Sequence, residues 1–121
     1  MKFNRFEEIE VWKLSRILVK YIYHITRQEE FSKDFGFKDQ IRRSSVSIPS
    51  NIAEGYERKS NVEFIRYLFI AKDSAGELRT QIYLAYDLEY VDEETCKNLL
   101  SKSEEISKSL SGFIKYLDSK K

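Results

Sequence analysis

The stretch Gln40-Ile-Arg-Arg-Ser-Ser-Val-Ser-Ile-Pro-Ser-Asn-Ile-Ala-Glu-Gly55 decides how this chain folds. Its apolar residues recur at helical spacing, since Ile41, Ile48 and Ile52 are separated by seven and four positions. The only proline of the chain, Pro49, stands inside this pattern. A proline in a helix interior removes a backbone donor and costs roughly 3 kcal/mol. The stretch therefore predicts a helix over about residues 38–56 that is kinked at Pro49 or divided there into two short helices.

Polar residues around the proline are expected to compensate for the missing hydrogen bond. The carbonyl freed near Ser45 needs a donor, and Ser44, Ser45, Ser47 and Asn51 are close enough in sequence to supply one. More often such groups are satisfied within the helix than by a ligand. Gly55 suits the turn by which the chain leaves the helix.

Three further amphipathic segments flank this helix, at about residues 6–27, 60–90 and 92–117. Short linkers join the last three helices, so these helices should pack antiparallel. The pattern predicts an all-α protein, a single domain over residues 1–121, arranged as an up-down-up-down antiparallel four-helix bundle. The first helix has an unusually wide apolar face, which predicts a second partner surface beyond its own bundle.

Local signals refine this architecture. Ser60 and Asp92 are expected to cap the third and fourth helices. Residues 29–36 read as a loop whose phenylalanines could cover one end of the core: Phe31, Phe35 and Phe37. The third helix carries an apolar seam at alternating spacings of four and three, in which Ala71 and Ala75 would allow close approach of a neighbouring helix. Close packing is also the expected reason for Gly76, because glycine weakens a helix by roughly 1 kcal/mol relative to alanine.

Composition bounds the function only loosely. The net charge of +1 gives no general attraction to nucleic acid or membrane, although residues 77–94 sum to −5 and residues 97–121 to +3. The lone cysteine, Cys96, excludes an internal disulfide and fits a reducing compartment. No apolar run approaches the ~20 residues of a membrane span, and no signal-type segment opens the chain. The expected location is the cytoplasm.

Four motifs, taken together, resemble a known family. They are Phe6-Glu-Glu-Ile-Glu-Val-Trp-Lys13, the stretch Gln40–Gly55, Glu63-Phe-Ile-Arg-Tyr-Leu68 and Glu77-Leu-Arg-Thr-Gln81. In these motifs the chain is similar to the four-helix bundle proteins of the 23S rRNA intervening-sequence family, over about residues 3–117. One departure concerns Asp73, which stands where the family commonly has glycine and puts the helix contact there in doubt.

The resemblance implies a small bacterial protein that forms an up-down-up-down bundle and assembles as a ring-like homopentamer. Some members are encoded within intervening sequences of large-subunit ribosomal RNA genes. A related group serves as accessory proteins of diversity-generating retroelements and binds a reverse transcriptase and nucleic acid. For most members the molecular function is not established.

Basic residues are the candidate contacts for RNA or DNA phosphates. They are Arg42, Arg43, Arg58, Lys59 and Arg66. The alternative is structural, with Arg42 or Arg43 paired to Glu54 or Glu77, one arginine pointing inward and the other outward. The remaining residues of the motif are assigned structural roles: Ser47, Pro49, Asn51, Glu54, Gly55 and Glu77. Tyrosines such as Tyr23, Tyr67, Tyr83 and Tyr86 could stack on bases, but at helical spacing they are more often core or interface.

No residue pattern indicates an enzyme, a cofactor site or a metal site. His24 and Cys96 form the only conceivable thiol–imidazole pair, and nothing in the sequence orients them. One histidine and one cysteine cannot complete a tetrahedral metal site. The leading hypothesis is a non-enzymatic homo-oligomeric scaffold or adaptor for RNA, DNA or a nucleic-acid-processing protein. The alternative is a purely protein-binding module whose partner docks on the acidic surface of residues 77–94 or on the rim of the ring.

Overall fold

A computed structural model describes residues 3–120 of the chain and contains only helices in that range. A 3-10 turn, η1 (Phe6–Glu8), precedes five α-helices. These are α1 (Glu10–Thr26), α2 (Glu29–Lys33), α3 (Phe35–Glu57), α4 (Asn61–Asp87) and α5 (Glu93–Asp118). The predicted all-α class is confirmed.

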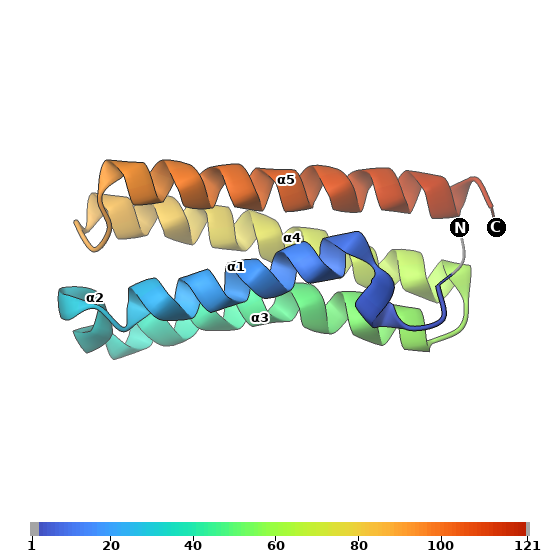
Figure 1. The fold of residues 1–121 in the computed structure, drawn as a ribbon, viewed down its shortest axis with the longest axis horizontal. Helices are drawn as coiled ribbons and strands as arrows, with labels where there is room; N and C mark the ends of the chain where they lie inside the picture. Colours follow the sequence, from blue (N-terminus) through green and yellow to red (C-terminus); the bar gives the residue numbers. More distant parts are fainter. Residues whose placement is uncertain (1–2, 121) are drawn as a thin grey trace.

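The four long helices α1, α3, α4 and α5 lie lengthwise along one another (Figure 1). The short helix α2 lies at the end where α1 gives way to α3, and the turn between α4 and α5 lies at the same end (Figure 1). The turn between α3 and α4 lies at the opposite end. The arrangement therefore has two distinct ends, and the candidate sites differ between them.

The sequence predicted a loop over residues 29–36, and this is wrong. The segment contains α2 and the start of α3. Asp34 is the reason, because its Oδ1 accepts a hydrogen bond from the Phe37 amide at 3.2 Å and caps α3 three residues earlier than expected. The predicted caps are confirmed: Ser60 accepts from the Glu63 amide at 3.4 Å, and Asp92 from the Thr95 amide at 2.8 Å.

Pro49 lies inside α3, which runs as one helix, so the expectation of two short helices is wrong. Polar side chains on the next turn bridge to the neighbouring helix. The Asn51 amide Nδ2 donates to the Ser47 carbonyl at 2.8 Å and lies 2.9 Å from its Oγ, which is 2.9 Å from the Ser74 Oγ on α4. The prediction that these side chains bond the carbonyl freed at Ser45 is therefore wrong: Asn51 bonds the Ser47 carbonyl, and the hydroxyls of Ser44 and Ser45 donate to the carbonyls of Gln40 and Arg42.

Close approach between helices occurs at two places. On α4, Ala71 and Ala75 are fully buried, and the Ser103 hydroxyl of α5 donates to the Ala75 carbonyl at 3.3 Å. On α3, Gly55 is buried against α4, and a Cβ there would lie 2.6 Å from the Cβ of Tyr67. The prediction that Gly55 forms the turn out of α3 is therefore wrong. Gly55 lies inside α3 and permits close contact between α3 and α4.

Gly76 contradicts the expectation of close packing within the chain. It is exposed on α4, and a Cβ built there would meet no atom within 4 Å. Glycine destabilises a helix relative to alanine, and no contact among the described residues 3–120 offsets this loss at Gly76.

Aromatic rings close the end of the core that lies near α2. Phe31 is 1% exposed and stacks on Phe37 at 5.6 Å and on Tyr90 at 4.9 Å, measured between ring centroids. The Tyr90 hydroxyl donates to Asp34 Oδ2 at 2.7 Å. Phe35 does not take part, contrary to prediction, since it is 70% exposed.

The wide apolar face of α1 is mostly covered by the chain itself. Leu18, Ile22 and Ile25 are buried, and Trp12 and Leu14 pack half-buried against the core. Among its large apolar residues only Ile17 is strongly exposed, at 57%. The predicted second partner surface is therefore not evident on α1.

Candidate nucleic-acid interface

The five predicted basic residues fall into two separate groups. Arg42 and Arg43 lie in the first half of α3, whereas Arg58, Lys59 and Arg66 lie around the turn between α3 and α4. From residue 42 to residue 58 the chain advances 16 positions, which is about 24 Å along a helix. A single phosphate cannot bridge the two groups.

Arg42 is held by α1 and not by the predicted acidic partners. Its Nε donates to the Thr26 Oγ1 at 2.8 Å, and its guanidinium carbon lies 4.3 Å from the centroid of the Tyr23 ring. Arg43 is exposed and contacts no described charged group. The expectation of one inward and one outward arginine agrees with this arrangement, but pairing with Glu54 or Glu77 is wrong. Glu54 bonds Arg58 instead, and Glu77 is exposed.

The group at the α3–α4 turn is largely neutralised. Arg58 lies 3.2 Å from Glu54 and also donates to the Tyr67 hydroxyl at 2.6 Å. Arg66 pairs with Glu63 at 3.1 Å, and its hydrogen bond lowers the pKa of the Glu63 carboxyl below the usual range. These pairs are exposed, so they add little to stability. They nevertheless reduce the positive potential that a phosphate would encounter.

Aromatic rings support the same turn. Both Arg58 and Arg66 lie over the Tyr67 ring, at 5.0 and 4.9 Å from its centroid. Lys59 lies 5.0 Å from the centroid of the Tyr56 ring and adopts a positive φ of 61°. The turn is thus ordered by cation–π contacts within the chain. Of this group only Lys59 has no carboxylate partner.

A hollow of about 480 Å³ lies beside the arginine pair on α3. It is lined by Tyr23 of α1 and by Asp39, Arg42, Arg43, Val46 and Ser47 of α3. The hollow therefore combines fixed donors, a carboxylate and an aromatic ring. Sequence reasoning found the arginines but missed Tyr23 and Thr26 as their partners, because nothing in the sequence indicates the register of α1 against α3.

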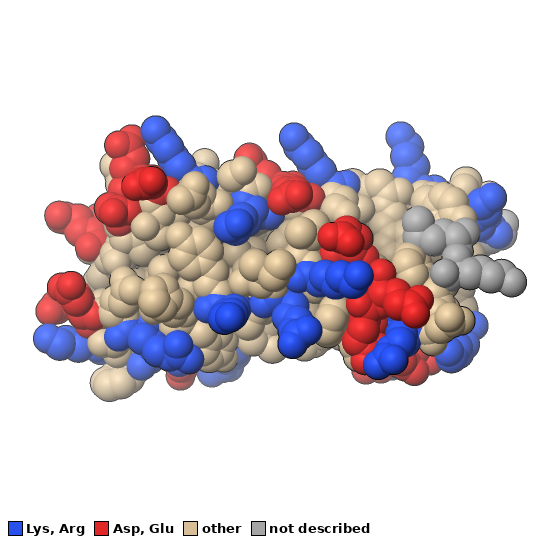
Figure 2. Space-filling view, in the orientation of Figure 1, with Lys and Arg blue, Asp and Glu red and all other residues tan. Residues whose placement is uncertain are grey.

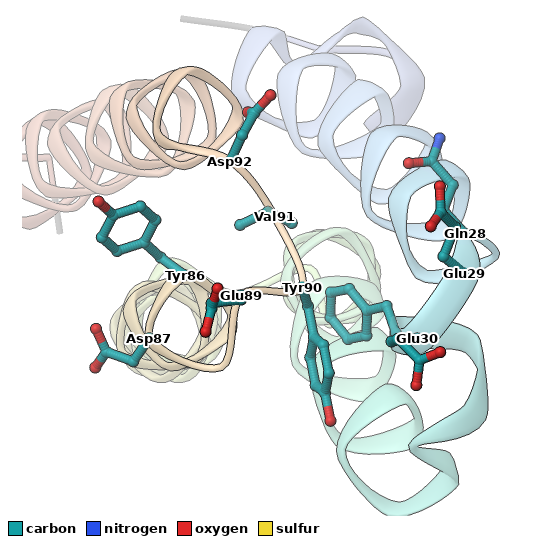
Figure 3. A pocket seen from close by; sticks show the side chains of 10 residues that line it. Gln28, Glu29, Glu30, Tyr86, Asp87, Glu89, Tyr90, Val91 and Asp92 are labelled. Carbon is teal, nitrogen blue, oxygen red and sulfur yellow. The ribbon is translucent and has the colours of Figure 1, made fainter.

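A larger hollow, of about 730 Å³, lies at the end of the molecule near α2. Its carboxylates come from two sides, Glu29 and Glu30 from α2 and Asp87, Glu89 and Asp92 from the end of α4 and the following turn (Figure 3). Acidic side chains gather at this end of the surface (Figure 2). Tyr86 and Tyr90 also line the hollow. Its carboxylates make this end unsuited to phosphate.

The outer face of α4 exposes apolar side chains that the sequence pattern did not indicate as one surface. Val62, Phe69 and Tyr83 are 59%, 51% and 54% exposed. With Gly76 they recur every seven residues, close to two helical turns, and so share one face. The spacing was visible in the sequence, but the parallel seam that includes Phe64, Leu68 and Leu78 is equally regular. Only the fold shows which seam is buried.

Among the described residues, His24 and Cys96 do not form a thiol–imidazole pair. His24 is exposed and lies within hydrogen-bond distance of Gln28 Nε2, at 3.1 Å, and Cys96 is buried on α5. Burial, with Asp87 and Glu93 nearby, raises the pKa of the Cys96 thiol above its ordinary value. Within residues 3–120 no group of three metal-ligating side chains is placed to hold an ion. No helix in that range is long and apolar enough to cross a membrane.

Comparison with known proteins places the chain among relatives. A family model described as 23S rRNA-intervening sequence protein matches residues 7–112. A crystal structure of a protein of unknown function from the S23 ribosomal protein family of Bacteroides thetaiotaomicron VPI-5482 is similar, with 31% identity and a TM-score of 0.80. The similarity covers 87% of this chain and 95% of that one. No curated protein matches. The family match spans most of the chain and carries the Gln40–Gly55 motif, so the chain belongs to the 23S rRNA-intervening sequence protein family.

Proposed function

We propose that this chain is a non-enzymatic, homo-oligomeric scaffold or adaptor that binds RNA or DNA through Arg42 and Arg43. In this proposal each protomer is an up-down-up-down four-helix bundle with α3 bent at Pro49, and the family resemblance suggests a ring of five copies. The assembly would act in the cytoplasm, alone or with a nucleic-acid-processing protein. The exposed outer face of α4 is the observation that carries the proposal.

The face formed by Val62, Phe69, Gly76 and Tyr83 supports assembly in three ways. Its apolar side chains are exposed although the opposite face of α4 is fully buried. Isolated exposed apolar residues are ordinary, but a row of them along one helix favours a partner surface. Gly76 lies in the row with no neighbour within 4 Å, as expected where the helix of a second copy must approach closely.

Assembly through this face predicts that the double substitution Phe69→Glu with Tyr83→Glu yields a monomer. Buried carboxylates without partners strongly oppose association. The measurement is the mass by light scattering at micromolar concentration, where the unmodified chain is expected to be oligomeric. Ile17→Glu, which changes an equally exposed side chain on α1, is the control and should leave the mass unchanged. A monomeric parent chain, or dissociation by Ile17→Glu alone, would contradict the proposal.

The nucleic-acid part rests on the arginine pair. Arg42 is fixed by Tyr23 and Thr26, so little side-chain entropy remains to be lost when its free donors meet a nucleic acid. Arg43 is exposed beside it and has no competing carboxylate contact. Repetition of this pair in a closed assembly would multiply a weak contact.

Binding should therefore weaken steeply as salt increases, and Arg43→Ala should weaken it at every sequence tested. Loss of one phosphate contact per site is expected to reduce the slope of log affinity against log salt concentration by about 1. Fluorescence anisotropy with a labelled oligonucleotide is the measurement. Arg66→Ala is the matched control and should have the smaller effect, because Glu63 already pairs with Arg66. Loss of assembly in Arg43→Ala would instead make that side chain structural.

A purely protein-binding module is the second candidate, and one observation favours it. Beside the acidic hollow at the α2 end, Leu84, Tyr86 and Leu88 are 45%, 41% and 52% exposed. Carboxylates around exposed apolar groups suit a basic, amphipathic protein segment. Purification of the native assembly that recovers a protein partner and no nucleic acid would select this candidate.

A further inference from the structure

The hollow between α1 and α3 offers donors and acceptors together. Arg42 and Arg43 supply donors, Asp39 supplies a carboxylate, and Tyr23 supplies an aromatic wall. Its volume of about 480 Å³ lies within the range of ~300–1,000 Å³ typical of small-ligand pockets. A carboxylate beside the arginines repels phosphate, so Asp39 favours a ligand that also carries hydrogen-bond donors.

Arg42 is presented in one orientation. Its Nε is occupied by Thr26 at 2.8 Å, and its guanidinium lies 4.3 Å from the centroid of the Tyr23 ring. The two terminal nitrogens, Nη1 and Nη2, are therefore the donors left for a ligand. A guanidinium with free terminal donors forms two parallel hydrogen bonds to a planar pair of acceptors.

Asp39 precedes the arginines by three and four positions on α3, so its carboxylate lies on the same side of the helix, about one turn away. This spacing allows an ion pair, yet no contact within 4.0 Å joins Asp39 to either arginine, and Asp39 is exposed. Both the acceptor and the donors therefore stay open to a ligand. A ligand that uses both groups must carry acceptors and donors on adjacent edges of one rigid, flat ring system.

Guanine has this pattern. Its N7 and O6 accept two hydrogen bonds, the pair that arginine characteristically recognises, and its N1 and N2 carry hydrogens that a carboxylate accepts. Adenine offers a donor where guanine has O6, and pyrimidines are too small to reach both groups. A tyrosine ring and an arginine plane are also the usual stacking partners of unpaired bases.

We infer that the hollow formed by Tyr23, Asp39, Arg42 and Arg43 binds an unpaired guanine nucleotide. Arg42 donates to O6 and N7, Asp39 accepts from N1 and N2, Tyr23 borders the ring, and Arg43 contacts the adjoining phosphate. The guanine must be unpaired because cytosine occupies N1 and N2 in a duplex. The inference rests on the proposed function, which it narrows to single strands that display guanine.

The test compares labelled single-stranded eight-nucleotide oligouridines that carry one central guanine or one central adenine. Anisotropy with the full assembly is expected to give about tenfold tighter binding of the guanine strand. Asp39→Asn should reduce this preference, because only the Arg42 contact to O6 and N7 then distinguishes guanine from adenine. If the arginines bind phosphate alone, Asp39→Asn removes a repelling charge and increases the affinity for both strands equally. An unchanged ratio of the two affinities would overturn the inference.

Asp73→Asn, an equal change of charge at an exposed site on α4, is the control and should keep the preference. Arg42→Lys, which keeps the charge but loses the planar donor pair, should also reduce it. Free GMP is expected to displace the strand at a lower concentration than AMP, and equal displacement by the two would overturn the inference. If the parent chain binds both strands equally, only this inference fails. If it binds neither at low salt, the proposed nucleic-acid function fails with it.

Discussion

Phe31→Ala is expected to lower the free energy of unfolding by about 3–5 kcal/mol, the usual loss for a buried phenylalanine. Phe31 is 1% exposed, and its ring joins elements that are distant in sequence. It stacks on Phe37 at the start of α3 and on Tyr90 in the turn between α4 and α5. Removing the ring leaves a cavity at the end of the core, which a helix of five residues such as α2 cannot fill. Urea denaturation followed by circular dichroism measures the loss.

Phe35→Ala is the matched control for this substitution. Phe35 lies four positions later but is 70% exposed, and Lys38 lies over its ring at 4.8 Å. Its removal should change the free energy of unfolding by no more than about 0.5 kcal/mol, as for most surface substitutions. Equal effects of the two substitutions would show that the aromatic end does not contribute to the core.

Gly55→Ala is expected to destabilise the protein by about 1–3 kcal/mol, although alanine is the better helix former. The added methyl group would lie 2.6 Å from the Tyr67 Cβ and 3.0 Å from a ring carbon of Phe64. A Cβ atom cannot move without its backbone, so α3 and α4 must separate. Thermal unfolding of the variant should show a lower midpoint.

Gly112→Ala is expected to raise the midpoint of thermal unfolding, the opposite of Gly55→Ala. Gly112 lies inside α5, and a Cβ there meets nothing within 4 Å. The substitution should stabilise the helix by about 0.5–1 kcal/mol, because it reduces the backbone freedom of the unfolded chain. Stabilisation by Gly55→Ala as well would mean that α3 and α4 are less closely packed than the structure indicates.

Patterns within single helices were the most predictable features. Capping by Ser60 and Asp92 depends on groups three residues away, and the 3.6-residue period depends on the backbone alone, so both could be predicted. The start of α3 at Phe35 was missed although its cap, from the Phe37 amide to Asp34, is equally local; Asp34 also accepts a hydrogen bond from Tyr90, 56 positions away. A local pattern cannot indicate the second contact.

Residue types were predicted better than their partners. The motif that contains Arg42 and Arg43 was visible at once, and its length identified the family. Pairing with Glu54 or Glu77 failed because the register between helices decides which side chains meet. That register places Arg42 beside Thr26 and Tyr23 on α1, and leaves Glu54 one turn from Arg58.

The sequence by itself determined the helical class and the family, because helix periodicity and a long uninterrupted motif are properties of the chain in order. Only the tertiary structure decided what each glycine and each arginine does. Gly55 and Gly112 are chemically identical and both lie inside helices, yet one is in contact with α4 and the other faces open space. The difference arises from the distance between helices, which is set by the packing of many side chains at once.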